Sequence, residues 1–184
     1  MPIRKMGLFF LFATGAATIF IATSGAQSPP ARKSAPATSG RVQANLGQLM
    51  KGILYPASNI IFAAQNDNPA DVPPAKDPST ATNPLASAYG KWEAVENSAL
   101  ALSEVANLLM LPGRKCANGR AVPINNPDWP KFVQGLRDAG AVVYKAAQTK
   151  NQDKIVDAAD VMTTACANCH DKYREKPNLA DRCQ

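Results

Sequence analysis

Residues 85–109 of the chain read LASAYGKWEAVENSALALSEVANLL. Apolar residues recur along them in alternating steps of three and four, which is the period of one face of an α-helix, whereas a strand would need steps of two. The pattern predicts a helix packed against neighbouring helices. Asn83 and Pro84 provide a start signal, and Pro112 and Gly113 end the helix. The inner positions expected are Leu85, Ala88, Trp92, Val95, Ala99, Leu102, Ala106 and Leu109.

Three other segments have the same helical period. The first runs from about residue 41 to residue 65 and contains Pro56, which predicts a kink or a break there. Pro130 opens the second segment, and the third begins after a turn around Asn151 and Asp153. Four amphipathic helices and no strand pattern predict an all-α protein, an antiparallel up-down-up-down four-helix bundle. The expected inner positions of the three segments are Val42, Leu46, Leu49, Ile53 and Ile60; Phe132, Leu136, Ala139, Val143 and Ala146; and Ile155, Ala159, Met162, Cys166, Cys169 and Tyr173.

The composition agrees with a single helical domain. Of the 184 residues, 46% are hydrophobic and 18% are charged, which suits one compact domain with a sizeable core. These figures exclude a disordered charged protein, a coiled-coil rod and a multi-span membrane protein. The net charge is +6 and no long run of Lys or Arg occurs, so nucleic acid is not an expected partner.

The N-terminal region is typical of a secretory signal peptide. Arg4 and Lys5 provide a positive start, an apolar run covers residues 6–22, and small residues precede an expected cleavage point after Ala26. The alternative is an anchor that is not cleaved. Cleavage predicts export to the periplasm and no stable membrane insertion of the mature protein. The expected division of the chain is a signal peptide (1–26), a flexible leader rich in Pro, Ser and Ala (27–40), the four-helix domain (41–176) and a C-terminal tail (177–184).

Residues 166–170, Cys-Ala-Asn-Cys-His, match the C-x-x-C-H pattern by which haem is attached in c-type cytochromes. Residues three and four apart share a face of a helix. Cys166 and Cys169 can therefore bond to the two vinyl groups along one porphyrin edge while His170 binds the iron. Both cysteines also fall on the inward stripe of the last expected helix, so the porphyrin edge would enter the bundle. The motif predicts one covalently bound haem c.

Other interpretations of this motif are open. Cys166, Cys169 and His170 could bind zinc with one of the remaining cysteines, although a bundle of this size needs no metal to hold it together. A thioredoxin-like dithiol would need a strand before the helix, and none is predicted. A disulfide between Cys166 and Cys169 would be awkward inside a helix and leaves the adjacent histidine unexplained.

The surroundings of the motif resemble those in class II cytochromes c, the cytochrome c′ group. As in that family, a C-terminal C-x-x-C-H is followed by an aromatic residue and an arginine, here Tyr173 and Arg174, on the last of four helices. A methionine on the first helix also precedes a proline by six positions, as Met50 precedes Pro56. The resemblance implies that the residue on the distal side of the haem lies on the first helix and that Arg174 lies near the proximal side. Tyr173 is expected to pack against the porphyrin.

His170 is the only histidine, so the second axial ligand cannot be another histidine of the same chain. Methionine sulfur is the usual alternative. Met162 lies on the same helix as the motif, and Met110 lies near the end of the helix predicted over residues 85–109. In an up-down-up-down bundle, Met50 on the first helix lies at about the height of His170. Met50 is therefore the candidate sixth ligand. The alternatives are that Met50 is an ordinary core methionine and that Met110 binds the iron or the sixth position is vacant or holds water.

The remaining cysteines, Cys116 and Cys183, are expected at the haem end of the bundle, in a loop and in the tail. A disulfide between them would hold the tail over this end and contribute about 4 kcal/mol at most to stability. Two free thiols are the alternative, which is unusual for an exported protein. Arg41 and Arg114 are either partners of the haem propionates or ordinary solvated charges.

Together these features favour an exported cytochrome that carries single electrons between redox partner proteins. The alternatives are a five-coordinate protein that binds NO or CO, as the resemblance to cytochrome c′ implies, and a haem subunit of a larger redox complex. No acid–base constellation suggests an enzyme, because Glu93 and Glu96 fit a solvated helix face. The sequence leaves open whether the protein forms a homodimer.

Overall fold

The structure is a computed structural model that describes residues 41–183. The expected signal peptide (1–26) and leader (27–40) lie outside the described residues, as does the last residue of the tail. Within the described part, no helix is both long enough and apolar enough to cross a membrane.

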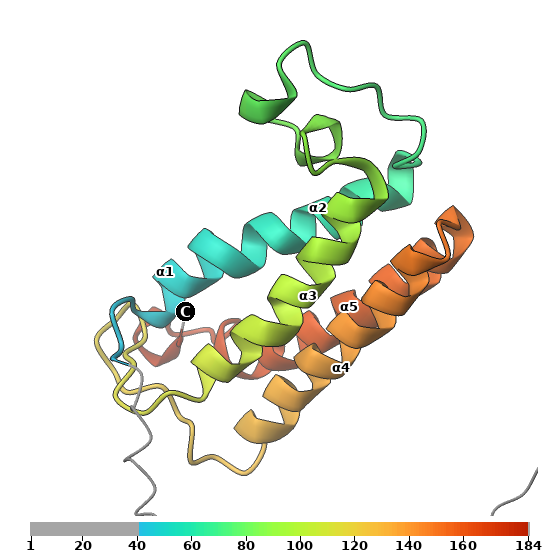
Figure 1. Ribbon diagram of the computed structural model, residues 1–184. Helices are drawn as coiled ribbons and strands as arrows, with labels where there is room; N and C mark the ends of the chain where they lie inside the picture. The colour runs from blue at the N-terminus through green and yellow to red at the C-terminus, as the bar shows by residue number, and fades with distance from the viewer. Residues whose placement is uncertain (1–40, 184) are drawn as a thin grey trace, which may run out of the picture. The chain divides into compact units, whose positions relative to one another are not determined.

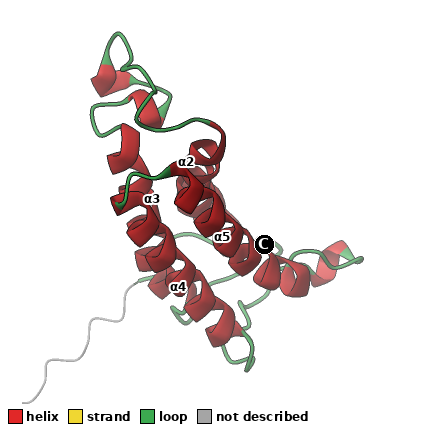
Figure 2. Cartoon of the chain, turned by 90° about the vertical axis from the view of Figure 1, so that its right-hand side faces the viewer, coloured by secondary structure: helices red, strands yellow, loops and turns green. Residues whose placement is uncertain are grey.

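Four long helical segments form an antiparallel bundle (Figures 1 and 2). Each packs on its neighbour in sequence, and the last packs on the first. Residues 41–183 contain no strand, so the prediction of an all-α four-helix architecture is confirmed. The first segment joins α1 (Leu46–Leu49), the π-helical turn η1 (Met50–Leu54) and α2 (Tyr55–Asn66), and the others are α3 (Lys91–Leu109), α4 (Trp129–Gln148) and α5 (Gln152–Tyr173). Single 3₁₀ turns are η2 (Pro78–Thr80), η3 (Pro84–Ala86) and η4 (Leu179–Asp181).

Helix α3 has the predicted core positions but begins later than predicted. Asn83 caps the separate turn η3, in which the backbone N–H of Leu85 donates to the Asn83 side chain. The chain then folds back at Gly90, where a Cβ atom would lie 2.4 Å from the carbonyl oxygen of Leu85. Ala88 therefore lies in a turn and is exposed rather than buried. The predicted positions that are buried are Leu85, Trp92, Val95, Ala99, Leu102, Ala106 and Leu109.

The first helix begins at Leu46, five residues later than predicted. The Asn45 side chain accepts a hydrogen bond from the backbone N–H of Gln48 at 2.8 Å, and the Gln48 side chain accepts one from the backbone N–H of Asn45 at 2.9 Å. This reciprocal pair is a capping box, which satisfies two N–H groups at the helix start. Leu46 and Leu49 are buried, as predicted.

The helix continues through Pro56 instead of breaking there. Proline has no N–H to donate to the carbonyl of the residue four positions earlier, which is Gly52. The chain passes this point in a π turn, in which the backbone N–H of Tyr55 donates to the carbonyl oxygen of Met50, five residues earlier. The predicted break at Pro56 is therefore wrong, and the π turn η1 lies directly before the proline.

This turn shifts the buried face of the first helix by one residue. Leu54 and Ile61 are buried, whereas the predicted Ile53 is 39% exposed and Ile60 is only half-buried. A π turn accommodates one residue more than an α-turn, and one residue corresponds to a rotation of about 100° on a helix. The predicted stripe therefore holds at Leu46 and Leu49 and is wrong from Ile53 onward, and the predicted Val42 lies before the helix and is half-buried.

Helices α4 and α5 complete the core. Trp129, at the start of α4, is almost fully buried, and its indole N–H donates to the carbonyl oxygen of Leu109 at 3.2 Å. Phe132 and Ala146 are half-buried rather than buried, so the inner stripe of α4 is broader than predicted. The predicted positions that are buried are Leu136, Ala139 and Val143 on α4 and Ile155, Ala159, Met162 and Tyr173 on α5.

The close packing of α3 on α4 depends on Gly140. A Cβ atom at Gly140 would lie 2.2 Å from the Ser103 Oγ and 2.9 Å from the backbone carbonyl oxygen of Ala99. We expect Gly140→Ala to lower the free energy of unfolding by about 1–3 kcal/mol, because the two helices must move apart. Gly135→Ala on the same helix is the control: beyond the backbone of its own helix turn, no atom lies within 4 Å of its Cβ position. It should stabilise the protein by about 0.5–1 kcal/mol through helix propensity. Urea unfolding measures both changes, and a stabilising Gly140→Ala would contradict this account.

A disulfide between Cys116 and Cys183 joins the α3–α4 loop to the C-terminal tail, as predicted. The two Cα atoms lie 4.9 Å apart. The side-chain amide of Asn118 donates to the carbonyl oxygens of Ala180 at 3.0 Å and Arg182 at 2.6 Å. The tail is therefore held against the loop by covalent and hydrogen bonds, and its described end lies near the start of α1 (Figure 1).

Arg114 is buried in the α3–α4 loop rather than free to meet a haem propionate. Its guanidinium donates to the carbonyl oxygens of Ala44 at 2.5 Å and Leu108 at 3.1 Å. These bonds tie the segment before α1 to the end of α3. The buried position indicates a structural role, which differs from both alternatives considered for Arg114, a propionate partner and a solvated charge. Arg41 is exposed and does not line the cavity described below.

Candidate functional site

The bundle contains a cavity of about 400 Å³ between the first helix, α4 and α5. A volume of this order is typical of sites that bind a small molecule or a cofactor. Most of the wall is apolar, and a few polar and sulfur-containing side chains interrupt it. Apolar wall residues are Leu46, Leu54, Leu102, Trp129, Phe132 and Leu136.

The C-x-x-C-H motif lies on one wall of this cavity. Cys166, Cys169 and His170 are all in the C-terminal part of α5 and all line the cavity. The helix ends just beyond them, where the backbone N–H of Arg174 donates to the carbonyl oxygen of His170 at 2.7 Å. The three side chains are half-buried, and the two thiols are not bonded to each other. One helix face therefore presents two sulfurs and an imidazole to the same space.

Burial sets the protonation of these side chains. Loss of solvent raises the pKa of the Cys166 thiol, and it raises the pKa of Cys169 to about 11, with the neighbouring Cys166 and Asp128 adding to the effect. Burial, followed by the charge of Arg174, lowers the pKa of His170. At neutral pH the cysteines are thus thiols and the histidine is a neutral imidazole, which is the form that binds metals.

The structure argues against two of the alternatives for the motif. A zinc site would need a third cysteine, but Cys116 and Cys183 are bonded to each other. Among residues 41–183, no group of three or more His, Cys, Asp and Glu side chains is placed to hold a metal ion. A thioredoxin-like arrangement needs a preceding strand, and α5 instead follows α4 through a short turn capped by Asn151. The motif is therefore distinguished by the apolar cavity beside it, which neither of these two alternatives requires.

Met50 lies on the wall formed by the first helix. It is half-buried, it begins the π turn η1, and it lines the same cavity as His170. Met110 and Met162 do not line this cavity, and Met162 is fully buried in the core. Of the three methionines considered as ligands, only Met50 shares a cavity with the motif.

The π turn shapes this wall. The residues of the first helix that line the cavity recur four positions apart, through α1, η1 and α2. An α-helix of 3.6 residues per turn would rotate such positions steadily away from one line. The wider π turn compensates for this drift, so one continuous stripe faces the cavity. Its members are Leu46, Met50, Leu54 and Ser58, with Gly47, Lys51 and Tyr55 beside them.

Tyr173 is fixed between the cavity and the α3–α4 loop. Its hydroxyl donates to the Asp128 carboxylate and accepts a hydrogen bond from the side-chain amide of Asn126 at 3.2 Å. Its ring meets Trp129 edge to face, with centroids 5.0 Å apart, and meets Phe132 in the same way at 6.3 Å. Burial, followed by the bond to Asp128, raises the pKa of Tyr173, so it stays a neutral donor. The aromatic ring next to the motif is therefore held in one orientation.

The bond from Tyr173 makes Asp128 a source of pH-dependent stability. This hydrogen bond is the main cause that lowers the pKa of Asp128, and Lys172 contributes through its charge. A carboxyl whose pKa is lower in the folded state stabilises the fold above its unfolded pKa, near 3.8, and loses this effect as the pH falls below that value.

We expect Asp128→Asn to lower the free energy of unfolding at pH 7. The difference in this free energy between the variant and the parent protein should become smaller below about pH 4. Urea unfolding at pH 7, 5, 4 and 3, values that bracket the ordinary carboxyl pKa, measures the profile. Asp157→Asn is the control, because Asp157 is exposed on α5 and makes no side-chain hydrogen bond or ion pair within residues 41–183. A difference in the free energy of unfolding that does not change with pH would contradict the role assigned to Asp128.

Arg174 lies at the mouth of the cavity. Its side chain is exposed, lines the cavity and forms an ion pair with Glu175 at 2.5 Å. Lys51 and Tyr55 on the first helix are also exposed lining residues. These three side chains show that the cavity opens to solvent between the first helix and the end of α5.

No family model, curated protein or solved structure matches this chain. The case for a ligand therefore depends on the cavity and on the chemistry of its walls.

The residues present fit a covalently held haem. Two thiols three residues apart and an adjacent neutral imidazole share one apolar cavity with a thioether sulfur from another helix. Thiols suit thioether bonds to a porphyrin, and imidazole and thioether suit axial bonds to iron. The apolar wall suits the faces of the porphyrin, and the open mouth leaves room for its polar groups.

Several wall residues were not predicted from the sequence. Trp129, Phe132 and Leu54 line the cavity, but each has the same local pattern as any other buried apolar residue. Asp128 and Asn126 hold Tyr173 although more than 40 residues separate them from it. No sequence signal short of the three-dimensional arrangement would have marked them.

Proposed function

We propose that the protein is an exported c-type cytochrome with one covalent haem, which carries single electrons between redox partner proteins in the periplasm. One observation carries the proposal: Cys166, Cys169, His170 and Met50 line a single cavity of about 400 Å³. The shared cavity is what an attachment site with two axial ligands requires.

Each residue has a definite task in this proposal. Cys166 and Cys169 would hold the porphyrin edge, since each thiol could add across one vinyl group, with its sulfur on one carbon and its proton on the other. His170 on α5 would bind the iron through a neutral ring nitrogen. When bound, the haem supplies an iron that gains or loses one electron.

Met50 is the proposed sixth ligand. Its thioether carries no proton and no charge, so it can stay in place in both oxidation states, and methionine ligation raises the reduction potential. Tyr173, held by Asp128, would pack against the porphyrin and keep water from that side. Arg174 would lie beside the haem at the cavity mouth.

An optical spectrum of the reduced protein tests this proposal. Protein exported by a host with working c-type maturation should show a low-spin c-type haem whose spectrum does not change with carbon monoxide. Absence of haem would reject the proposal. Rapid binding of carbon monoxide would favour the second candidate, a five-coordinate gas-binding protein. The apolar residues Leu46 and Leu54, which flank Met50 on the distal wall, are the observation in its favour.

Met50→Ala is expected to convert the low-spin spectrum to high-spin and to open the iron to carbon monoxide. The measurement is the absorption spectrum of both oxidation states. Met110→Ala is the matched control, because Met110 is a partly buried methionine outside the cavity and should leave the spectrum unchanged. If Met50→Ala leaves the low-spin spectrum intact, Met50 is not the ligand.

A further inference from the structure

Charged side chains are distributed unevenly along the bundle. A plane through the middle of each helix divides the bundle into two halves. The half that contains most of the cavity consists of residues 41–56, 100–138 and 163–183. The other half consists of residues 57–99 and 139–162. The cavity half contains 11 Lys and Arg and 6 Asp and Glu, a net charge of +5. The far half contains 5 and 8 of them, a net charge of −3. The bundle is therefore electrically polarised along its axis.

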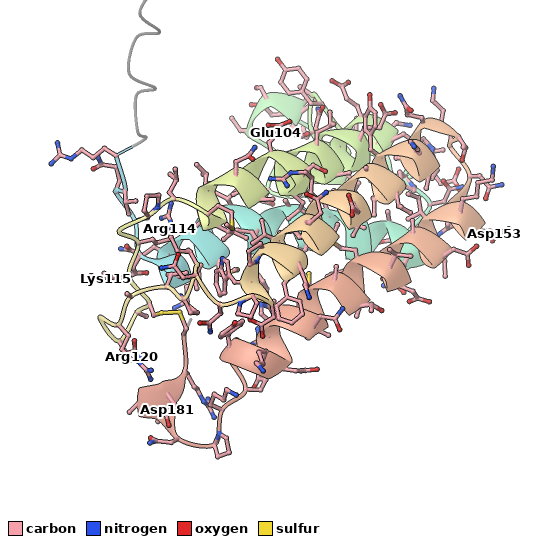
Figure 3. The ribbon with its side chains drawn as sticks, turned by 90° about the horizontal axis from the view of Figure 1, so that it is seen from below. Glu104, Arg114, Lys115, Arg120, Asp153 and Asp181 are labelled. Carbon is pink, nitrogen blue, oxygen red and sulfur yellow. A yellow bond between two sulfur atoms is a disulfide. The ribbon has the colours of Figure 1, made fainter. Side chains whose placement is uncertain are left out.

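Labelled charges mark the two ends of the bundle. Figure 3 shows Lys115 and Arg120 at one end, where Asp181 pairs with Arg120, and Asp153 at the opposite end. Lys115 and Arg120 belong to the α3–α4 loop, which is joined by the disulfide to the tail beside the cavity. Asp153 lies in the first turn of α5 at the far end, and Asp157 and Asp160 follow it on that helix.

The cavity opens on the positive half. Lys51, an exposed residue at its mouth, forms no ion pair with any residue in the described part of the chain. Tyr55 beside it is 65% exposed, and Leu179 on the tail is 69% exposed. Exposed aromatic and apolar side chains amid positive charge are features of a surface that meets another protein.

We propose that this end of the molecule docks an acidic face of a redox partner protein. The inference rests on the proposed function, because the mouth is where a haem edge would approach a partner. A field of one sign at the mouth and the opposite sign at the far end would turn an approaching acidic partner toward the cavity before contact.

A protein partner suits this surface better than an anionic membrane. Three carboxylates, Asp171, Glu175 and Asp181, stand among the cations at the cavity end. A uniformly anionic lipid surface would repel all of them. A protein can place basic groups opposite these carboxylates and acidic groups opposite the lysines and arginines, which gives specificity as well as attraction.

The test uses the purified mature protein and a synthetic peptide of ten glutamates as the probe of an acidic surface. Titration followed by amide NMR shifts should perturb residues at the cavity end, and the binding should weaken as salt is added. Lys51→Glu should weaken the binding by about threefold at low salt, within the range of one surface charge pair. Lys154→Glu, which makes the same charge change on α5 at the far end, should leave it nearly unchanged.

The outcomes separate this inference from the proposed function. The peptide titration needs no electron transfer, so it reports on the surface even if the optical spectrum rejects an electron carrier. The inference would be overturned if Lys51→Glu and Lys154→Glu weakened peptide binding equally. It would also be overturned if the amide NMR shifts were spread over both ends of the bundle. Binding to phosphatidylglycerol vesicles without binding to the peptide would also overturn it, in favour of a membrane surface.

A redox probe provides a second readout when haem is present. Hexacyanoferrate(III), a trianion, takes one electron from the reduced protein, and its rate should fall as salt is added. Lys51→Glu should slow this reaction more than Lys154→Glu does. A rate that is equal in the two variants would contradict steering by the cavity end.

Discussion

Replacing Cys166 and Cys169 with alanine is expected to yield a protein whose intact mass is that of the polypeptide alone. Both thiols line the cavity, and neither is used in a disulfide. Without them no thioether bond to a porphyrin can form, so any haem that remains must be held only by axial bonds and apolar contact. Intact-mass measurement after denaturation, with a haem stain of a denaturing gel, gives the result.

The matched control for this variant is Cys116→Ala with Cys183→Ala. It removes the same number of sulfur atoms, but from the structural disulfide, and should leave covalent haem in place. Far-UV circular dichroism checks that both variants keep their helices. Covalent haem in the first variant, or its loss from both, would show that the motif does not attach it as proposed.

The same control variant is expected to lose about 4 kcal/mol in its free energy of unfolding. The disulfide joins residues 67 positions apart, and a bond that closes so long a loop removes much of the conformational entropy of the unfolded chain. Cys116 is 2% exposed, so truncating it also leaves a small gap in the packing. Unfolding by guanidinium chloride measures the change.

Reduction of the parent protein with a dithiol should reproduce most of this loss, because it opens the same bond without changing the sequence. Cys166→Ala with Cys169→Ala should keep the loop closed, and its unfolding should still respond to the dithiol. A change of less than about 1 kcal/mol on removing the disulfide would mean that the tail is held by its other contacts, such as the hydrogen bonds from Asn118.

The helices were predictable because their signals are local. On α3, apolar residues spaced three and four apart are buried from Trp92 to Leu109. The first helix shows where such reasoning fails: Leu46 and Leu49 follow the pattern, but Leu54 is buried in place of Ile53 within the π turn. The face with Ile53 and Ile60 and the face with Leu54 and Ile61 are both apolar. The spacing of apolar residues alone therefore could not show which of the two faces is buried.

The candidate site was predictable in its chemistry but not in its surroundings. Cys166, Cys169 and His170 form a motif of five residues on one helix, and their shared face follows from helix geometry. The position of Met50 at the same cavity required the antiparallel order of the helices. The bond from Tyr173 to Asp128 required the course of the α3–α4 loop, which no periodic pattern describes.

The amino-acid sequence by itself determined the helical class, the four helical segments and the face on which the two thiols and the imidazole lie. Helical period and hydrogen bonding within one helix depend on neighbouring residues alone, so these features needed no tertiary information. Only the tertiary structure decided the register of the first helix after Met50, the walls of the cavity and the partners of Tyr173. Those depend on which buried groups find room and hydrogen bonds across the bundle, and that balance involves residues far apart in the chain.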